Sequence, residues 1–262
     1  MTKRTRLDAE LVRRGLASTR SEAKRAIEEG KVSVRGLAQP RPSSLVAADL
    51  GIELTSPPRP FVSRGGQKLD AALARFDVEV AEREWLDAGA STGGFTDRLL
   101  KGGAAGVIAL DVGYGQLDFG LRNDPRVVVL ERTNIRKVAA NDLPWTPSGV
   151  VADLSFISLA LVLPALANLA KVDADFVLLV KPQFEVGKSD VGKGGVVRDP
   201  DSWRAAMSSV VSAGSGLGVG LVDACASPLT GPAGNREFFV HLRRGGTAGA
   251  GSIDAAIDEV SA

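Results

Sequence analysis

From Phe61 onward, short apolar segments of strand length alternate with longer amphipathic segments. This order predicts a mostly parallel β-sheet with helices on both faces, because parallel strands need a crossover connection that is usually helical. The last two apolar segments are separated by PLTGPAGNR, which leaves no room for a helix and predicts a hairpin with an antiparallel edge strand. The seven expected strands are 84–89, 106–113, 126–132, 149–156, 175–182, 220–227 and 237–243, and the expected helices include 68–76, 96–103, 157–170 and 202–214.

A turn rich in glycine, serine and threonine follows the first of these strands, in EWLDAGASTGGFTDRLL. Open parallel sheets bind ligands at the carboxyl ends of their strands, so this turn is a candidate ligand site. A P-loop is excluded because Gly94 is followed by Phe95 and Thr96 instead of Lys and Ser or Thr, and the glycines lack the GxGxxG spacing of a dinucleotide site. S-adenosylmethionine (SAM) carries an amino acid, a sulfonium cation and no phosphate, and it suits a small-residue turn that follows a strand containing Asp87.

A second acidic residue lies where a nucleoside cofactor needs one. Asp111 comes 17 residues after Gly94, near the end of the next expected strand, where a carboxylate can accept hydrogen bonds from two ribose hydroxyls. Either aspartate alone is better explained as a cap of a strand or turn, but the two together predict a SAM site. The expected cofactor-binding residues are Asp87, Gly89, Ser91, Thr92, Gly93, Gly94, Phe95, Asp111, Asn134 and Asp153.

The N-terminal part of the chain has a different character. Residues 1–60 hold 12 of the 32 Lys and Arg but only 7 of the 31 Asp and Glu, so the basic surplus lies there and the remainder is mildly acidic. LDAELVRRGL and STRSEAKRAIEEG have helical spacing and end at Gly15 and Gly30, and KVSVRG alternates like a strand. On charge pattern alone, a solvated charged face explains these residues better than RNA binding does. The residues that could contact RNA are Arg4, Arg6, Arg13, Arg14, Arg20, Lys24, Arg25 and Arg64.

Composition limits the other classes of protein. One cysteine and one histidine exclude a disulfide framework and are too few for a Cys/His zinc site, so we expect no metal. No apolar stretch reaches the roughly 20 residues of a membrane span, and charged residues occupy the N-terminus, so a cytoplasmic protein is expected. We expect an RNA-binding domain at 1–58, a linker at 59–62, a catalytic domain at 63–244 and a flexible tail at 245–262.

Four charged residues are candidates for chemistry because they lie near expected strand ends or within apolar sequence. They are Lys68, Asp153, Lys181 and Glu237. Each has an ordinary explanation by itself, as a solvated helix charge, a helix cap, a strand terminus or an edge-strand charge. Together, they match the Lys-Asp-Lys-Glu set of the FtsJ-like ribose 2′-O-methyltransferases, which this chain resembles.

Longer motifs carry the resemblance further. The segment AELVRRGLASTRSEAKRAIEEGKVSVRG resembles the S4-type RNA-binding module, and LDAGASTGGFT, DVGYGQL, VADLSFISL, LVKPQFEVGK and SPLTGPAGNREFF resemble the TlyA family of rRNA (cytidine-2′-O)-methyltransferases, some of which are described as haemolysins. The resemblance implies a Rossmann-like seven-stranded SAM-dependent methyltransferase sheet with a small N-terminal α+β S4 domain. It also implies methylation of 16S and 23S rRNA in ribosomal subunits, with an effect on sensitivity to capreomycin and viomycin.

The resemblance assigns roles to the four charged residues. Lys181 is the candidate base for the ribose hydroxyl, and Asp153 orients it. Lys68 and the SAM sulfonium favour the loss of a proton from Lys181, and Glu237 positions a lysine or the ribose. Three alternatives stay open: a SAM-binding assembly factor without catalysis, a membrane-active haemolysin, and a base methyltransferase, although VVADLSF lacks the Pro-Pro-aromatic motif of the last class. The oligomeric state is not readable from the sequence.

Overall fold

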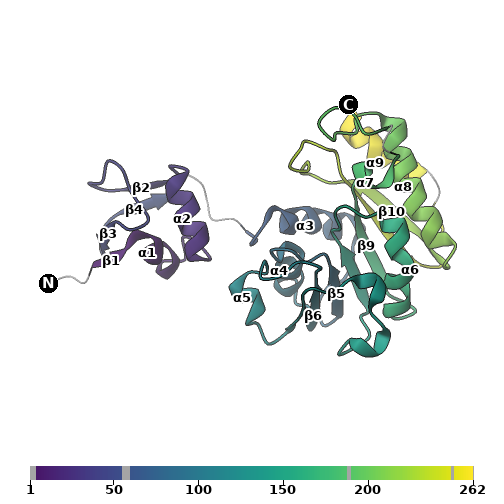
Figure 1. The fold of residues 1–262 in the computed structure, drawn as a ribbon, viewed down its shortest axis with the longest axis horizontal. Coiled ribbons are helices and arrows are strands. Elements are labelled where there is room, and N and C mark those ends of the chain that lie inside the picture. The colour runs from purple at the N-terminus through teal and green to yellow at the C-terminus, as the bar shows by residue number, and fades with distance from the viewer. Residues whose placement is uncertain (1–3, 55–59, 188–189, 249–250, 262) are drawn as a thin grey trace. The chain divides into compact units, whose positions relative to one another are not determined.

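The chain forms two compact units, Met1–Pro60 and Phe61–Ala262. The computed structural model describes residues 4–54, 60–187, 190–248 and 251–261 (Figure 1). The division between the units falls inside the interval 59–62 that the sequence predicts to be a linker.

The N-terminal unit packs two short helices against two small antiparallel strand pairs. Strand β1 pairs with β3, and β2 pairs with β4. Apolar residues from both helices and the strands, among them Leu7, Leu11 and Ile27, form its core. The elements are β1 (Arg4–Arg6), α1 (Leu7–Arg13), α2 (Arg20–Glu28), β2 (Val32–Val34), β3 (Leu45–Ala47) and β4 (Ile52–Leu54).

Helix α2 begins and ends where its sequence signals predict. The Thr19 hydroxyl accepts a hydrogen bond from the Glu22 amide at 3.1 Å, and the Glu22 carboxylate accepts one from the Ser18 amide at 2.9 Å. This reciprocal arrangement satisfies backbone donors that a helix start leaves unpaired. At the other end, Gly30 adopts a φ of 69°, a left-handed conformation that costs glycine little.

The C-terminal unit is built on a seven-stranded sheet in the order β10-β11-β9-β8-β5-β6-β7. Neighbouring strands from β9 to β7 run parallel, as the alternating sequence pattern predicts. The strands are β5 (Glu84–Ala88), β6 (Gly106–Leu110), β7 (Val127–Leu130), β8 (Gly149–Ala152), β9 (Asp175–Val180), β10 (Val219–Ala226) and β11 (Phe238–Arg244).

Helices cover both faces of the sheet (Figure 1). One apolar core joins the sheet to α6, α8 and α9, and the other joins it to α3 and α4. Within the described ranges, no helix combines the length and the apolar character needed to cross a membrane. The helical segments are α3 (Arg64–Phe76), α4 (Gly94–Lys101), α5 (Phe119–Arg122), α6 (Leu159–Leu169), α7 (Pro182–Glu185), α8 (Pro200–Ser215), α9 (Gly251–Ser261) and the 3₁₀ turns η1 (Ile135–Lys137) and η2 (Ala140–Asp142).

The sequence pattern predicts that the antiparallel strand lies at the edge of the sheet. This prediction is wrong. Strand β11 pairs with both β9 and β10, so the predicted hairpin is present but β10 forms the edge. The reason is burial: the side chains of Phe238, Phe239 and Val240 are fully buried, whereas Val222 of β10 is exposed. A strand that is apolar on both faces needs neighbours and cover on all sides.

The prediction of a flexible tail at 245–262 is wrong for most of this segment. Residues 251–261 form α9, in which Ile253, Ala256 and Ile257 are buried in the same core as α6 and α8. The Glu259 carboxylate also accepts a hydrogen bond from the Ala226 amide at the end of the edge strand, at 2.9 Å. Few large apolar residues occur in this segment, but three on one helical face are enough to dock it.

Candidate active site

The strand order reverses between β5 and β8, and a cavity of about 470 Å³ lies at the carboxyl ends of these strands. Open α/β sheets bind ligands at such a switch point. Five of the ten expected cofactor residues line the cavity: Gly89, Ser91, Asp111, Asn134 and Asp153. Side chains that the sequence analysis did not select complete the wall, namely Leu110, Val112, Gln116, Thr133, Ile135, Leu154, Ser155, Phe156 and Ile157.

Asp111 holds the glycine-rich turn in place. Its carboxylate accepts hydrogen bonds from the Ser91 amide at 2.7 Å and from the Gly113 amide at 2.6 Å. Gly89, at a φ of 85°, lies so close to β8 that a β-carbon would be 2.6 Å from the Asp153 carbonyl oxygen. The turn is therefore fixed against both neighbouring strands, with its backbone at the cavity wall.

Asp87 lies within the protein, beneath the turn. It is fully buried, and one carboxylate oxygen accepts a hydrogen bond from the Thr96 hydroxyl at 2.7 Å. The other oxygen is buried and has no hydrogen-bond partner among the described residues. Burial, with the nearby charges of Asp153 and Asp111 adding to it, raises the pKa of Asp87 to about 7, although the Thr96 hydrogen bond lowers it.

We expect Asp87→Asn to remove part of the pH dependence of folding stability. The folded-state pKa of about 7 exceeds the ordinary aspartate pKa of 3.8, so this carboxyl lowers the free energy of unfolding as pH rises from about 4 to 7. An asparagine cannot ionise and still offers an oxygen to Thr96. Chemical denaturation of both proteins across this range should show a smaller decrease for the variant, and parallel curves would contradict the raised pKa.

The rest of the predicted turn contributes backbone and packing. Gly93 has a φ of 94° and caps α4, which continues from Gly94. Thr92 is exposed and its carbonyl accepts a hydrogen bond from the Asp118 amide at 3.2 Å. Phe95 is 3% exposed and packs against Phe239, so its side chain supports the turn from the core and does not line the cavity. The assignment of Phe95 as a cofactor-binding residue therefore stays a prediction, with its side chain outside the cavity.

The four charged candidates form two ion pairs. Lys181 Nζ lies 2.5 Å from an oxygen of Asp153 and donates a hydrogen bond to the Ser155 hydroxyl at 3.1 Å. Lys68 pairs with Glu237. The sheet explains why they gather at one edge: Asp153 follows β8, Lys181 follows β9, and Glu237 precedes the antiparallel β11.

The two pairs differ in burial. The side chains of Lys68 and Glu237 are 9% and 1% exposed, whereas those of Lys181 and Asp153 are 12% and 25% exposed. Asp153 also lines the cavity, so this pair is the one next to a bound ligand. Glu237 neutralises Lys68 locally, so the pair with Lys68 is suited to hold α3 and β11 together.

Glu185 is a residue of the site that the sequence analysis missed. Its carboxylate accepts hydrogen bonds from the Ser158 hydroxyl at 2.6 Å and the Leu159 amide at 2.7 Å. These bonds join α7, which follows Lys181, to the segment that follows Asp153. Burial raises the pKa of Glu185, although the Ser158 hydrogen bond lowers it. Its position in the motif LVKPQFEVGK was the available signal.

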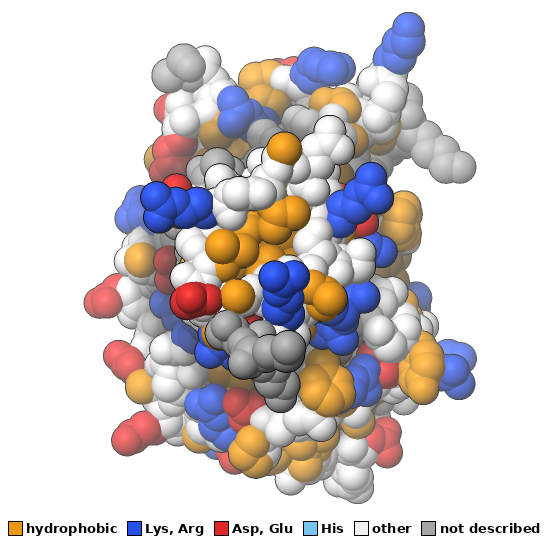
Figure 2. All heavy atoms as spheres, turned by 90° about the vertical axis from the view of Figure 1, so that its left-hand side faces the viewer, with side chains coloured by type: hydrophobic (Ala, Val, Ile, Leu, Met, Phe, Trp, Pro, Cys, Tyr) orange, Lys and Arg blue, Asp and Glu red, His pale blue; other side chains and the backbone are white. Residues whose placement is uncertain are grey.

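In the N-terminal unit, two buried acids hold the predicted arginines. Asp8 binds Arg6 at 2.9 Å and Arg20 at 3.0 Å, and these arginine side chains are 48% and 61% exposed. The Arg6 hydrogen bond lowers the pKa of Asp8 to about 2. Figure 2 shows the molecule from the left-hand side of Figure 1. On this face, Lys and Arg side chains lie on several sides of a cluster of hydrophobic side chains. The acids that fix these cations were not predicted.

Glu10 binds two arginines, one exposed and one largely buried. Arg13 binds it at 2.6 Å and is 58% exposed, whereas Arg14 binds it at 2.8 Å and is 22% exposed. Arg14 also donates to the carbonyls of Leu50 and Ala48, at 2.8 and 2.9 Å. Arg14 is therefore a structural residue of this unit, which leaves Arg4, Arg6, Arg13, Arg20, Lys24 and Arg25 as its exposed candidates for RNA contact.

Arg64 lies in the other unit, at the start of α3. Its guanidinium donates a hydrogen bond to the Thr230 carbonyl at 2.9 Å, in the connection that leads to Glu237. Arg64 is exposed and therefore remains a candidate for RNA contact beside the Lys68–Glu237 pair.

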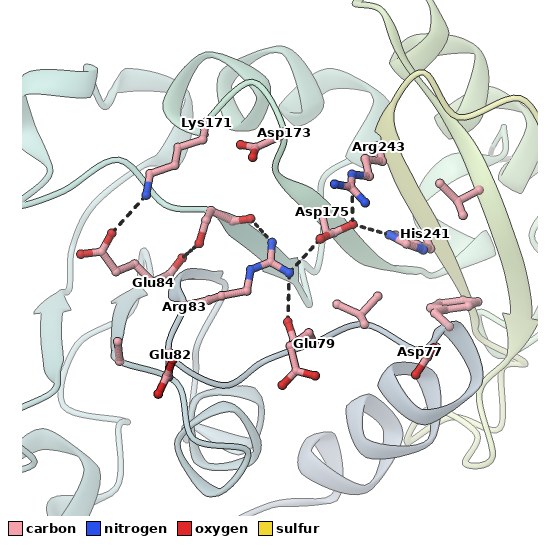
Figure 3. A pocket seen from close by; sticks show the side chains of 15 residues that line it. Asp77, Glu79, Glu82, Arg83, Glu84, Lys171, Asp173, Asp175, His241 and Arg243 are labelled. Carbon is pink, nitrogen blue, oxygen red and sulfur yellow. Dashed lines mark hydrogen bonds and ion pairs between the residues drawn. The ribbon is translucent and has the colours of Figure 1, made fainter.

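A second cavity, of about 720 Å³, lies at the amino ends of the parallel strands, opposite the candidate site (Figure 3). It contains none of the predicted site residues. Asp175 is its centre and pairs with Arg83 at 2.8 Å and with His241 at 2.9 Å. Burial raises the pKa of Asp175, but the hydrogen bonds from His241 and Arg83 outweigh it and the net shift is downward. The single histidine is thus part of a structural network remote from the strand ends that carry the candidate site.

Comparisons with known proteins agree with this architecture. The family description FtsJ-like methyltransferase matches residues 61–244, and the description S4 domain matches residues 5–36. The 16S/23S rRNA (cytidine-2′-O)-methyltransferase TlyA of Mycobacterium tuberculosis is 54% identical over 93% of this chain and 91% of its own length. The 23S rRNA (cytidine-2′-O)-methyltransferase TlyA of Campylobacter jejuni is 34% identical, over 76% of this chain and 77% of its own.

A solved structure covers nearly the whole chain. A hemolysin-named protein from Streptococcus thermophilus superposes with a TM-score of 0.75 and 36% sequence identity, covering 99% of this chain and 96% of that one. The similarity extends through both units and the sites described above. The chain therefore belongs to the FtsJ-like methyltransferase family and, with its S4 domain at the N-terminus, to the TlyA group within it.

Proposed function

We propose that this protein transfers the methyl group of SAM to the 2′-hydroxyl of cytidine in both 16S and 23S rRNA. The observation that carries the proposal is the Lys181–Asp153 ion pair, which borders a cavity of nucleoside size at the carboxyl edge of the sheet. The names of the two TlyA relatives support the substrate, and the more similar of them is the one named for both rRNAs. Action on ribosomal subunits would place the protein in the cytoplasm.

The volume and the lining residues of the cavity suit SAM. Its volume of about 470 Å³ is within the usual range for small ligands, and Leu110, Ile135 and Leu154 provide apolar walls for an adenine ring. Asp111 has acceptor capacity beyond its two backbone hydrogen bonds, which suits ribose hydroxyls. Gly89 leaves the backbone open where a side chain would collide with Asp153. When bound, SAM supplies an electrophilic methyl group on a sulfonium.

Lys181 is the residue that we assign to the ribose hydroxyl. A hydroxyl is a weak acid, so the transfer needs a group that accepts its proton or stabilises the developing negative charge. The Asp153 carboxylate and the Ser155 hydroxyl hold the Lys181 amine at the cavity side of β9. Much of the rate should come from alignment of the hydroxyl with the methyl–sulfur bond, which this fixed geometry favours.

The ion pair between Lys68 and Glu237 changes the role that the sequence analysis expected for Lys68. Glu237 neutralises Lys68, so Lys68 is a weak source of the positive potential that favours proton loss from Lys181. Lys68 and Glu237 would thus support the site through α3 and β11, and the Lys181–Asp153 pair would be the one that faces the ribose hydroxyl.

The S4 domain would bring the acidic catalytic unit to its RNA. Asp8 and Glu10 hold Arg6, Arg13 and Arg20 at the surface with their guanidinium groups partly exposed. Fixed arginines lose little conformational freedom on binding phosphate. The structured RNA would be recognised by shape and ribose hydroxyls, and a paired cytidine would have to leave its stack to present its ribose.

The test is methyl transfer from labelled SAM to unmodified 30S and 50S subunits, followed by nucleoside mass spectrometry. We expect 2′-O-methylcytidine from both subunits. Label in 50S subunits alone would restrict the substrate to 23S rRNA, and methylated bases would overturn the assignment of the acceptor. If SAM binds normally and no ribose is methylated, the chain would instead be a SAM-binding assembly factor.

A further inference from the structure

The cations of the catalytic unit are unevenly paired. Among the described Lys and Arg of this unit, eight form no ion pair with a carboxylate, and seven of these lie at the carboxyl edge of the sheet. By contrast, Arg83, Arg126 and Lys171 at the other edge are all paired. The eight are Arg64, Arg132, Arg136, Lys137, Lys193, Arg198, Arg236 and, at the opposite edge, Arg244.

Three of these cations, Lys193, Arg198 and Arg236, lie in two segments that the buried side chain of Asn235 holds together. Asn235 is 2% exposed, its side-chain oxygen accepts a hydrogen bond from the Val197 amide at 2.9 Å, and its side-chain nitrogen donates one to the Gly195 carbonyl at 2.8 Å. Lys193 and Arg198 flank the clamped residues 195–197, and Arg236 directly follows Asn235. Glu237 comes next, so this surface adjoins the Lys68–Glu237 pair.

The clamp keeps the backbone of this surface in one arrangement. Val197 is 1% exposed, and its carbonyl accepts a further hydrogen bond from the Trp203 indole at 3.1 Å. The side chains of Lys193, Arg198 and Arg236 are nevertheless exposed. A fixed backbone with exposed cations, in a unit whose net charge is negative, concentrates positive potential beside the Lys68–Glu237 pair.

We propose that Lys193, Arg198 and Arg236 form an RNA-contacting surface that binds phosphate groups of the strand entering the active site. The inference rests on the proposed function, because it concerns the same substrate. The ligand class is the RNA phosphodiester backbone, which is contacted chiefly by Lys and Arg side chains and makes no demand for base-specific donors. A basic surface here would let the S4 domain and the catalytic edge each hold part of one folded RNA.

The experiment compares two triple variants of the full chain that lose the same positive charge. One is Lys193→Ala/Arg198→Ala/Arg236→Ala, and the other is Arg126→Ala/Lys171→Ala/Arg244→Ala, which removes three exposed cations from the opposite edge. Affinity for unmodified 30S and 50S subunits is measured between about 50 and 200 mM KCl. SAM affinity and the thermal midpoint are measured for both variants.

The first variant should bind subunits roughly tenfold more weakly at low salt, and the slope of log affinity against log salt should fall by about 2, as expected for the loss of three phosphate contacts. Its SAM affinity should stay within about twofold of wild type. The proposal is overturned if both variants weaken binding equally, if the loss is independent of salt, or if SAM affinity falls as much as RNA affinity. If the wild type methylates no ribose but only the first variant loses salt-dependent binding, the surface stands and the proposed function fails.

Discussion

Lys181→Ala is expected to lower kcat for methyl transfer by about 10²–10⁴-fold, the usual contribution of a positioned proton acceptor. The amine lies 2.5 Å from Asp153 at the cavity, and no other described lysine or arginine pairs with that carboxylate. The variant should fold, because Asp153 is 25% exposed and its charge can be solvated after the loss of its partner. SAM and RNA affinities should change much less than kcat.

The matched control for this variant is Lys171→Ala. Lys171 is an exposed lysine that precedes β9, whereas Lys181 follows this strand. The ion pair of Lys171 with Glu84 is a long one, at 3.5 Å. Single-turnover rates with saturating SAM and subunits would separate chemistry from binding. Near-wild-type rates for Lys181→Ala, with normal RNA binding, would show that another group accepts the proton.

Lys68→Met is expected to lower the free energy of unfolding by about 3–5 kcal/mol, because it leaves the Glu237 carboxylate buried without its cation. The side chain of Glu237 is only 1% exposed, so water cannot replace the lysine. Methionine fills a similar volume, which limits the contribution of a cavity. Urea denaturation at neutral pH would measure the loss.

A double-mutant cycle separates the ion pair from packing. Glu237→Gln removes the charge and keeps the shape, so the Lys68→Met/Glu237→Gln variant should be more stable than the sum of the single changes predicts. A coupling energy of about 1–3 kcal/mol would fit residues in direct contact. Additive effects would mean that Lys68 contributes through its methylene groups alone. Activity should be impaired in all three variants, since both residues belong to the candidate site.

The fold was largely predictable because its signals are local. All seven expected strands are present, and the helices expected at 96–103, 157–170 and 202–214 connect β5 to β6, β8 to β9 and β9 to β10. The error at the edge of the sheet arose because strand order depends on which strands are covered, and Phe238 and Phe239 become buried only after the helices have packed. The error in the tail has the same origin, since α9 is stabilised by the core it meets and has only three large apolar residues of its own, Ile253, Ile257 and Val260.

The candidate site was predicted as a set of residues in which Asp153 orients Lys181, but the partner of Glu237 was left open between a lysine and the ribose. Motif spacing marked Lys68, Asp153, Lys181 and Glu237, yet nothing in it indicates that Lys68 pairs with Glu237 across 169 positions. Neither does it indicate that Arg14 turns inward to backbone carbonyls while Arg13 stays exposed. Contacts between distant segments depend on register and burial, which a single sequence does not encode residue by residue.

By itself, the sequence determined the alternation of strands and helices, the glycine-rich turn at a strand end, and the types of side chain available for chemistry. Each follows from periodicity or backbone conformation within a few residues. Only the tertiary structure decided which charges neutralise each other, which stay unpaired, and which carboxyl is driven towards protonation. Asp87 illustrates the reason: its pKa of about 7 comes first from burial, and burial is a property of the packed protein and not of the residues beside it in the chain.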